Sequence, residues 1–159
     1  MERYIFLDFD GVMNTRRSYR QYTANGGFWH DDLGPFFDPE AVANLKYLID
    51  TTEAGVVITS SWKYKGLDAM HSLWALRQMP GFLLDITPEV TDGFYSIRGA
   101  EVAKWLATAP MVPPEEYRYV IIDDSSDYLP EQMPLLINTD PEVGLTRHDA
   151  CSAIDILMA

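Results

Sequence analysis

Asp8 and Asp10 stand directly after a short apolar run and directly before Gly11. Side chains two positions apart in an extended chain point to the same side, so both carboxylates project together where the strand ends, and the glycine lets the chain turn away. Two close carboxylates repel each other, and a hard divalent cation relieves that repulsion. Because Mg²⁺ prefers one or two carboxylates together with waters and phosphate oxygens, this spacing indicates a Mg²⁺ site.

A second acidic pair, Asp123 and Asp124, ends another apolar run and would supply the remaining acidic ligands. A calcium loop of the EF-hand type is excluded. With Gly11 at its sixth position, such a loop would have Phe6 as the first ligand and Arg17 in place of the bidentate acid. Zinc is excluded as well, since the chain has one cysteine and no cluster of cysteine and histidine.

Four continuous apolar runs are predicted to be strands that position these side chains. They cover residues 4–7, 56–58, 119–122 and 135–137, and polar residues follow each of them: Asp8, Thr59, Asp123 and the stretch Asn138 to Asp140. Continuous rather than alternating apolar character is typical of parallel strands covered on both faces. A further short strand is expected near 82–86. Helices are predicted over 39–53, 66–79, 98–108 and 146–158.

This alternation of strands and helices predicts an open, mainly parallel α/β sheet with right-handed crossovers. Ligands of such sheets bind beyond the carboxyl ends of the strands, which is where the acidic residues lie. With 159 residues and no repeat or linker, the chain is expected to form one domain over 1–159. Segment 14–37 interrupts the pattern with arginines and aromatic residues, and is predicted to be a short, loop-like cap or lid.

The net charge and the cysteine content limit the ligands and the cellular location that are expected. The formal net charge is −12, so the molecule as a whole repels nucleic acid and anionic lipid unless basic residues or a cation concentrate locally. A single cysteine cannot form an internal disulfide, which favours a reducing, cytoplasmic location. No apolar run approaches the roughly 18 residues that span a bilayer, so no membrane association is expected. No feature points to an obligatory protein partner.

The order of the motifs resembles the haloacid dehalogenase (HAD) superfamily of phosphohydrolases. Asp-x-Asp-Gly-Val follows the first strand, Thr-Ser the second, a basic residue opens a helix, and Asp-Asp follows the next strand. Ile-Thr-Ser-Ser-Trp and Asn-Thr-Asp-Pro-Glu-Val-Gly-Leu-Thr also resemble the small HAD domain associated with bacterial RNA-repair proteins. The resemblance implies a Rossmann-like, doubly wound sheet, with segment 14–37 in the place of the superfamily's small cap.

The resemblance also implies roles for the acidic residues. Asp8 would be the nucleophile that forms an aspartyl-phosphate, and Asp10 would protonate the leaving oxygen and then activate water. Mg²⁺ would be bound by Asp8, by Asp10 through its backbone carbonyl, and by Asp123. Asp124 or Asp127 would hold a water of the ion's ligand shell.

Thr59 ends its strand directly and is the expected hydrogen-bond donor to phosphate, with Ser60 next in line. The basic residue is either Arg98, at the opening of a helix, or Lys104, further inside it. Position favours Arg98, whose planar fork can pair with phosphate and with Asp8 together.

A positive rim is expected around the same strand ends, where it would bind substrate. It would consist of Arg16, Arg17, Arg20, Lys63, Lys65 and Arg98. Such a rim would attract a phosphorylated group to an acidic protein.

The leading hypothesis is a HAD-type phosphatase, a Mg²⁺-dependent phosphomonoesterase with an open site. Its substrate would be a phosphorylated small molecule such as a nucleotide, a nucleic-acid end or a phosphoprotein. One alternative is a phosphotransferase or mutase acting on a small sugar phosphate, which a larger enclosing cap would favour. The other is a non-catalytic, Mg²⁺-binding regulatory module, against which the presence of both Asp8 and Asp10 argues.

Overall fold

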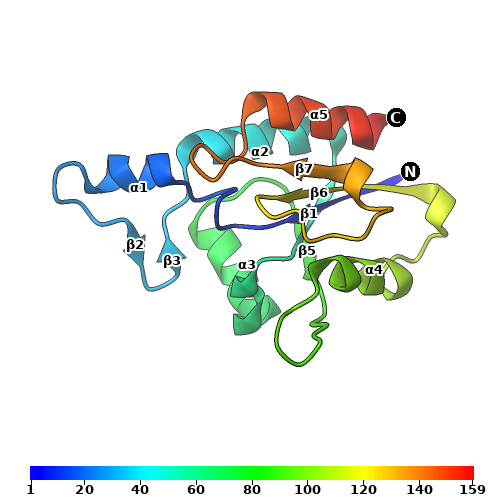
Figure 1. The fold of residues 1–159 in the computed structure, drawn as a ribbon. Helices are drawn as coiled ribbons and strands as arrows, with labels where there is room; N and C mark the ends of the chain where they lie inside the picture. Colours follow the sequence, from blue (N-terminus) through cyan, green and yellow to red (C-terminus); the bar gives the residue numbers. More distant parts are fainter.

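The computed structural model describes residues 1–159 as a parallel sheet with helices on both faces (Figure 1). The five strands lie in the order β5-β4-β1-β6-β7, and every neighbouring pair is parallel. Their bounds are β1 (Glu2–Leu7), β4 (Gly55–Ile58), β5 (Leu83–Ile86), β6 (Tyr117–Asp123) and β7 (Leu136–Asn138). The predicted parallel α/β fold is therefore confirmed. None of the helices is both long and apolar enough to cross a membrane.

Four main helices flank the sheet, and capping side chains satisfy the first backbone N–H groups of two of them. The four helices are α2 (Pro39–Thr52), α3 (Leu67–Leu76), α4 (Arg98–Thr108) and α5 (Arg147–Met158). Asp38 accepts the N–H of Glu40 at the start of α2, and Thr146 and Asp149 form a capping box at the start of α5. All four helices fall within or close to the predicted ranges.

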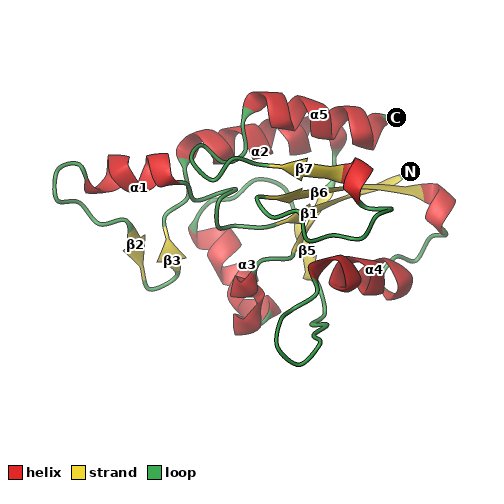
Figure 2. Cartoon of the chain, in the orientation of Figure 1, coloured by secondary structure: helices red, strands yellow, loops and turns green.

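Strand β1 is buried on both faces, which explains its continuous apolar character. Ile5 and Leu7 belong to the larger hydrophobic cluster, which includes residues of α2, α3 and α5. Tyr4 and Phe6 point to the opposite face, where they pack against residues of α4 such as Trp105. Figure 2 shows α2 and α5 on one side of the sheet and α4 on the other.

The register of the central strands brings their carboxyl ends to one edge of the sheet. Leu7 of β1 pairs with Ile58 of β4 and with Ile122 of β6. The next residues along these three strands are Asp8, Thr59 and Asp123. The fold therefore gathers three of the predicted site residues at the same level of the sheet.

Segment 14–37 is more regular than the predicted loop-like cap. It contains α1 (Arg16–Thr23) and a two-stranded antiparallel sheet of β2 (His30–Asp31) and β3 (Gly34–Pro35). The helix forms because Thr15 and Ser18 make a capping box that satisfies N–H groups at its start. Figure 1 shows this segment projecting beyond the strand ends, at the left of the view.

Arg77 at the end of α3 ties this segment to the body of the protein. Its Nη1 and Nη2 atoms donate to the two carboxylate oxygens of Asp31 at 3.0 and 2.9 Å, and Nη2 also donates to the carbonyl of Gly34 at 3.0 Å. The guanidinium carbon lies 4.9 Å from the centroid of the Phe36 ring. The hairpin is therefore held by several contacts from one side chain.

Replacing Arg77 by methionine should loosen the hairpin, because Asp31 and the Gly34 carbonyl lose their donors while the apolar stem is kept. We expect a loss of about 1 kcal/mol in the free energy of unfolding and faster amide exchange over residues 30–35. Lys46→Met removes an exposed pair within α2 and should cost less than about 0.5 kcal/mol. Equal exchange rates at the hairpin in wild type and Arg77→Met would contradict the assignment.

Candidate active site

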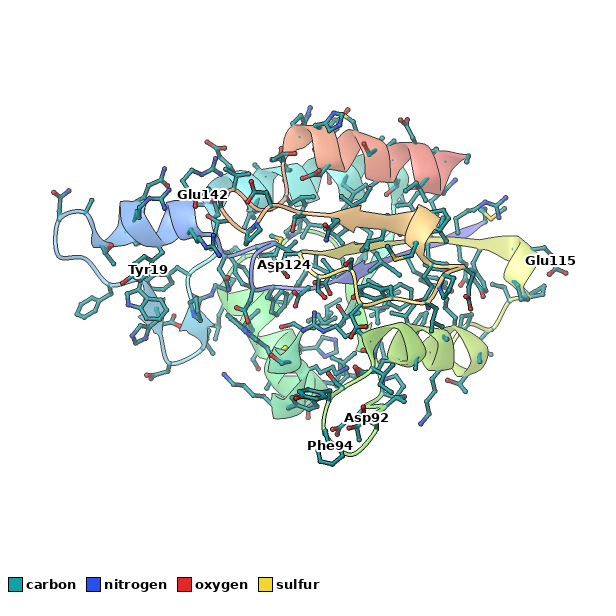
Figure 3. The ribbon with its side chains drawn as sticks, viewed as in Figure 1. Tyr19, Asp92, Phe94, Glu115, Asp124 and Glu142 are labelled. Carbon is teal, nitrogen blue, oxygen red and sulfur yellow. The ribbon has the colours of Figure 1, made fainter.

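Three carboxylates form an acid cluster at the carboxyl edge of the sheet: Asp8, Asp123 and Asp124. One carboxylate oxygen from each lies within 4.8 Å of the others. Asp8 is 3% exposed and Asp123 is fully buried, whereas Asp124 is more accessible. Figure 3 labels Asp124 near the centre of the view, where the strands end. The fold has brought together like charges that are 115 positions apart in the chain (123 minus 8).

Arg98, the first residue of α4, is the cation that faces this cluster. Its Nη1 atom lies 2.7 Å from Oδ2 of Asp123 and 3.2 Å from Oδ2 of Asp8. Tyr128 donates its hydroxyl to the same oxygen of Asp123 at 2.6 Å. Burial by itself lowers the pKa of Arg98, but the charges of Asp8 and Asp123 outweigh this effect and raise it. Lys104 is exposed further along α4 and makes no ion pair, so the geometry brings only Arg98 to the cluster.

Two polar atoms at this edge are buried without a hydrogen-bond partner. They are Oδ1 of Asp8 and Oγ1 of Thr59, on neighbouring strands. Buried polar atoms are nearly always paired, so an unpaired carboxylate oxygen beside two further carboxylates calls for a ligand. Three carboxylates facing one arginine leave an excess of negative charge. The residues therefore fit a hard divalent cation such as Mg²⁺.

Burial and neighbouring charges shift the pKa values of carboxyl groups in the cluster. Burial raises the pKa of Asp8 to about 8, with a further contribution from the charge of Asp123, while Arg98 opposes the shift. Burial also raises the pKa of Asp124, and a hydrogen bond with Asp123 adds to this. Without a cation the cluster therefore retains a proton near neutral pH.

Gly11 allows the chain to turn and lets Asp124 approach. Its φ is +78°, a conformation that residues with a Cβ rarely adopt. A Cβ placed on Gly11 would lie 2.3 Å from Oδ2 of Asp124, which is far inside contact distance. Thr139 donates its hydroxyl to the Gly11 carbonyl at 2.9 Å and fixes the turn from the other side.

Asp10 points its carboxylate away from the acid cluster. Asn14 donates to Oδ1 of Asp10 at 2.8 Å, and the indole N–H of Trp62 donates to Oδ2 at 3.3 Å. The side chain of Asp10 is not one of the three grouped carboxylates, so its backbone carbonyl stays a predicted ligand. Sequence reasoning identified neither Asn14 nor Trp62 as a partner of Asp10, because each contacts Asp10 only in the folded turn.

Ser60 and Lys63 follow Thr59, but their side chains are used internally. Ser60 is fully buried, and its hydroxyl accepts the N–H of Trp62 at the start of a 3-10 turn. Lys63 has a side chain that is 3% exposed, forms an ion pair with Glu101 and donates to Thr87 at 2.9 Å. Burial lowers the pKa of Lys63, and the Glu101 charge offsets part of the shift. Both side chains brace the turn after β4, and their contact with substrate stays a prediction.

The predicted positive rim is largely neutralised by acidic partners. Arg17 pairs with Asp38 at 2.9 Å and with Glu40 at 3.2 Å, and Arg20 pairs with Glu142. With Lys63 and Arg98 also paired, Arg16 and Lys65 are the two rim residues without an ion pair. The rim therefore has less free positive charge than its basic residues suggest, because acidic partners come from distant parts of the chain, and its contact with substrate stays a prediction.

A pocket of about 540 Å³ opens beside the acid cluster, and we call it the cap pocket. Asp10, Gly11 and Asp124 form the wall that it shares with the cluster. Most of the other lining residues belong to segment 14–37, with Arg16 and Tyr19 among them. The segment predicted as a cap thus forms one side of a pocket that borders the acidic site.

The site combines an Asp-x-Asp-Gly turn with an acidic pair at the carboxyl edge of a parallel α/β sheet. This is the arrangement expected for the HAD superfamily. The particular family follows from comparison with known families. A family model described as the HAD domain in Swiss Army Knife RNA repair proteins matches residues 4–150, and the chain belongs to this family. The resemblance predicted from the motifs is therefore confirmed. Comparisons with curated proteins and with solved structures gave no match.

Gly11→Ala should disrupt the acid cluster, because it adds a clash with Asp124 to the backbone strain. Gly26→Ala is a matched control, since Gly26 has a φ of +73° and nothing within 4 Å of its added Cβ. We expect about 1 kcal/mol of destabilisation in the control and about 1–3 kcal/mol more in Gly11→Ala. Urea unfolding measures both, and equal losses would show that Asp124 does not restrict this position.

The raised pKa of Asp8 predicts how stability depends on pH in chelator. Between an ordinary aspartate pKa of about 4 and the value of about 8, the folded protein holds a proton that the unfolded chain has lost. The free energy of unfolding therefore falls as the pH rises through this range, because the unfolded chain loses the Asp8 proton before the folded protein does. Asp8→Asn should gain free energy of unfolding relative to wild type between pH 5 and about pH 8. An Asp155→Asn control, at an exposed position of α5, should show no such trend. A difference between Asp8→Asn and wild type that is constant with pH would refute this reading.

Proposed function

We propose that the chain is a Mg²⁺-dependent phosphomonoesterase that acts through an aspartyl-phosphate on Asp8. The observation that carries the proposal is the buried, unpaired oxygen of Asp8, which lies in the acid cluster and next along the sheet edge from the unpaired hydroxyl of Thr59. One is suited to attack phosphorus and the other to donate to a phosphate oxygen. Membership of a HAD family indicates phosphohydrolase-type chemistry and supports the proposal.

In the first step a carboxylate oxygen of Asp8 attacks phosphorus, and the bond from phosphorus to the leaving oxygen breaks. Asp10 gives its proton to that oxygen as it leaves. In the second step water attacks the phosphorus of the aspartyl-phosphate and gives a proton to Asp10. The bond from phosphorus to Asp8 then breaks, which releases phosphate and restores both carboxyl groups.

Asp8, Asp123 and Asp124 would hold Mg²⁺, together with the backbone carbonyl of Asp10. When bound, the ion would neutralise charge on the phosphate oxygens and favour the ionised form of Asp8. Arg98 offsets part of the charge of Asp8 and Asp123, and its remaining N–H groups can donate to phosphate.

Asn14 and Trp62 would orient Asp10 for its proton transfers. Their hydrogen bonds reach both oxygens of the Asp10 carboxylate, so they restrict its rotation. Asp10 also lines the cap pocket, which places it between the acid cluster and open solvent. A proton donor in this position faces a leaving group that enters from the pocket side.

The proposal includes a phosphorylated substrate that is a small molecule or a nucleic-acid end, and a cytoplasmic location. The description of the family names RNA repair proteins, which favours nucleotides and nucleic-acid ends over phosphoproteins.

Hydrolysis of p-nitrophenyl phosphate tests the chemistry. Wild type should turn it over with Mg²⁺ and lose activity with chelator. Asp8→Asn should fall to background, and Asp10→Asn should lose about 10²- to 10⁴-fold in kcat. Asp155→Asn should match wild type.

Equal turnover by wild type and Asp8→Asn would contradict the aspartyl-phosphate. If no form of the protein is active but phosphate esters bind in a Mg²⁺-dependent way, the non-catalytic module would replace the phosphatase. Transfer of phosphate from a sugar phosphate to a second sugar, faster than to water, would instead establish the phosphotransferase.

A further inference from the structure

This inference rests on the proposed function, because the proposed reaction determines on which side of the phosphate the leaving group lies. Asp10 protonates the leaving oxygen, so the leaving group must lie next to the Asp10 carboxylate. The cap pocket lies there, since Asp10, Gly11 and Asp124 line it. Its volume of about 540 Å³ falls in the range of about 300–1,000 Å³ that is usual for small-molecule sites.

The walls of the cap pocket are rich in aromatic rings. Four of its lining residues are Tyr19, Tyr22, Trp29 and Phe36. The ring centroids of Tyr19 and Trp29 are 5.3 Å apart, and those of Tyr22 and Phe36 are 5.4 Å apart. Tyr19 is 50% exposed and Trp29 is 38% exposed, so both rings have free surface for a ligand. Aromatic surface of this kind suits a planar ring.

Most polar side chains of the pocket are already engaged. Thr15 donates its hydroxyl to Asp38 at 2.7 Å, Ser18 donates to the Thr15 carbonyl at 3.1 Å, and Asn14 donates to Asp10. The hydroxyl groups of a sugar would therefore find few partners here. A planar ring needs few, because stacking provides the attraction.

Arg16 adds a positive charge to the aromatic walls. Arg20 also lines the pocket but pairs with Glu142, whereas Arg16 is exposed and has no ion pair. A free guanidinium can stack on a base or bind a phosphate. Aromatic rings together with a free arginine are the groups by which proteins bind single nucleotides and single strands.

We propose that the cap pocket binds the nucleobase of a nucleotide whose phosphate lies at the acid cluster. Tyr19 and Trp29 provide the stacking surface, and Arg16 provides the charge. The nucleotide is either free or the terminal residue of a chain, since both present the same base and phosphate.

The test uses two unreactive ligands that differ only in the base. In the 5′-phosphonate analogues of AMP and of ribose 5-phosphate, a methylene replaces the bridging oxygen, so the proposed reaction cannot cleave them. Calorimetry with wild type and Mg²⁺ should give a Kd at least about 10-fold lower for the adenosine phosphonate. Tyr19→Ala and Trp29→Ala should each remove most of this preference without changing the Kd of the ribose phosphonate, and Tyr19→Phe should retain it.

Phe94→Ala is the matched control, because Phe94 is an 88% exposed aromatic residue outside the pocket. Figure 3 labels Tyr19 on α1 and Phe94 on the loop before α4, in separate parts of the molecule. This variant should keep the preference for the adenosine phosphonate. Equal Kd values for the two phosphonates in wild type, or an unchanged ratio in Tyr19→Ala and Trp29→Ala, would overturn the proposal.

Because these ligands are not turned over, failure of the pocket proposal is distinct from failure of the phosphatase. A base preference without aryl-phosphate hydrolysis would support the base-binding pocket and contradict the phosphatase. Hydrolysis without a base preference would support the phosphatase and contradict the base-binding pocket. Competition by tetranucleotides that carry such an uncleavable phosphonate at the 3′ or 5′ end then distinguishes the sources. Stronger competition than by the free adenosine phosphonate assigns the pocket to a chain end, and weaker competition assigns it to a free nucleotide.

Discussion

The rest of the site depends on one electrostatic constraint, the crowding of three carboxylates at the carboxyl edge of the sheet. Like charges this close cannot all ionise in a buried place unless opposite charge joins them. Arg98 supplies part of that charge from the start of α4, and it leaves one oxygen of Asp8 unpaired. The folded protein therefore carries a raised pKa at Asp8 and a position suited to a divalent cation. The same arrangement that costs stability without a cation is the basis for proposing a phosphate-ester site here.

The geometry around the cluster places the carboxylates of Asp8 and Asp10 in different environments. Asp8 is buried and faces the cation position, whereas Asp10 turns outward and is held by Asn14 and Trp62. The turn at Gly11 makes this separation possible, since a side chain there would collide with Asp124. Two aspartates that are almost adjacent in the chain thus come to face different environments, as the proposed roles of nucleophile and proton donor require.

Segment 14–37 extends the site rather than enclosing it. Arg77 fastens its hairpin to α3, and Arg17 and Arg20 anchor it through Asp38 and Glu142. The arginines of this segment therefore serve mainly to hold it in place. What remains for a ligand is aromatic surface and the single free guanidinium of Arg16, which is the basis for proposing a base-binding pocket.

The sequence by itself determined the parallel α/β fold, the main helices and the residues at the strand ends. These depend on local signals, namely continuous apolar runs, capping residues and the Asp-x-Asp-Gly turn. Only the tertiary structure decided which charges remain free. Lys63 lies four residues after Thr59, yet it is buried against Glu101, and Arg17 is paired with Asp38. The pairing of a charged side chain depends on residues that are far away in the chain and close in space, and no local pattern records that distance.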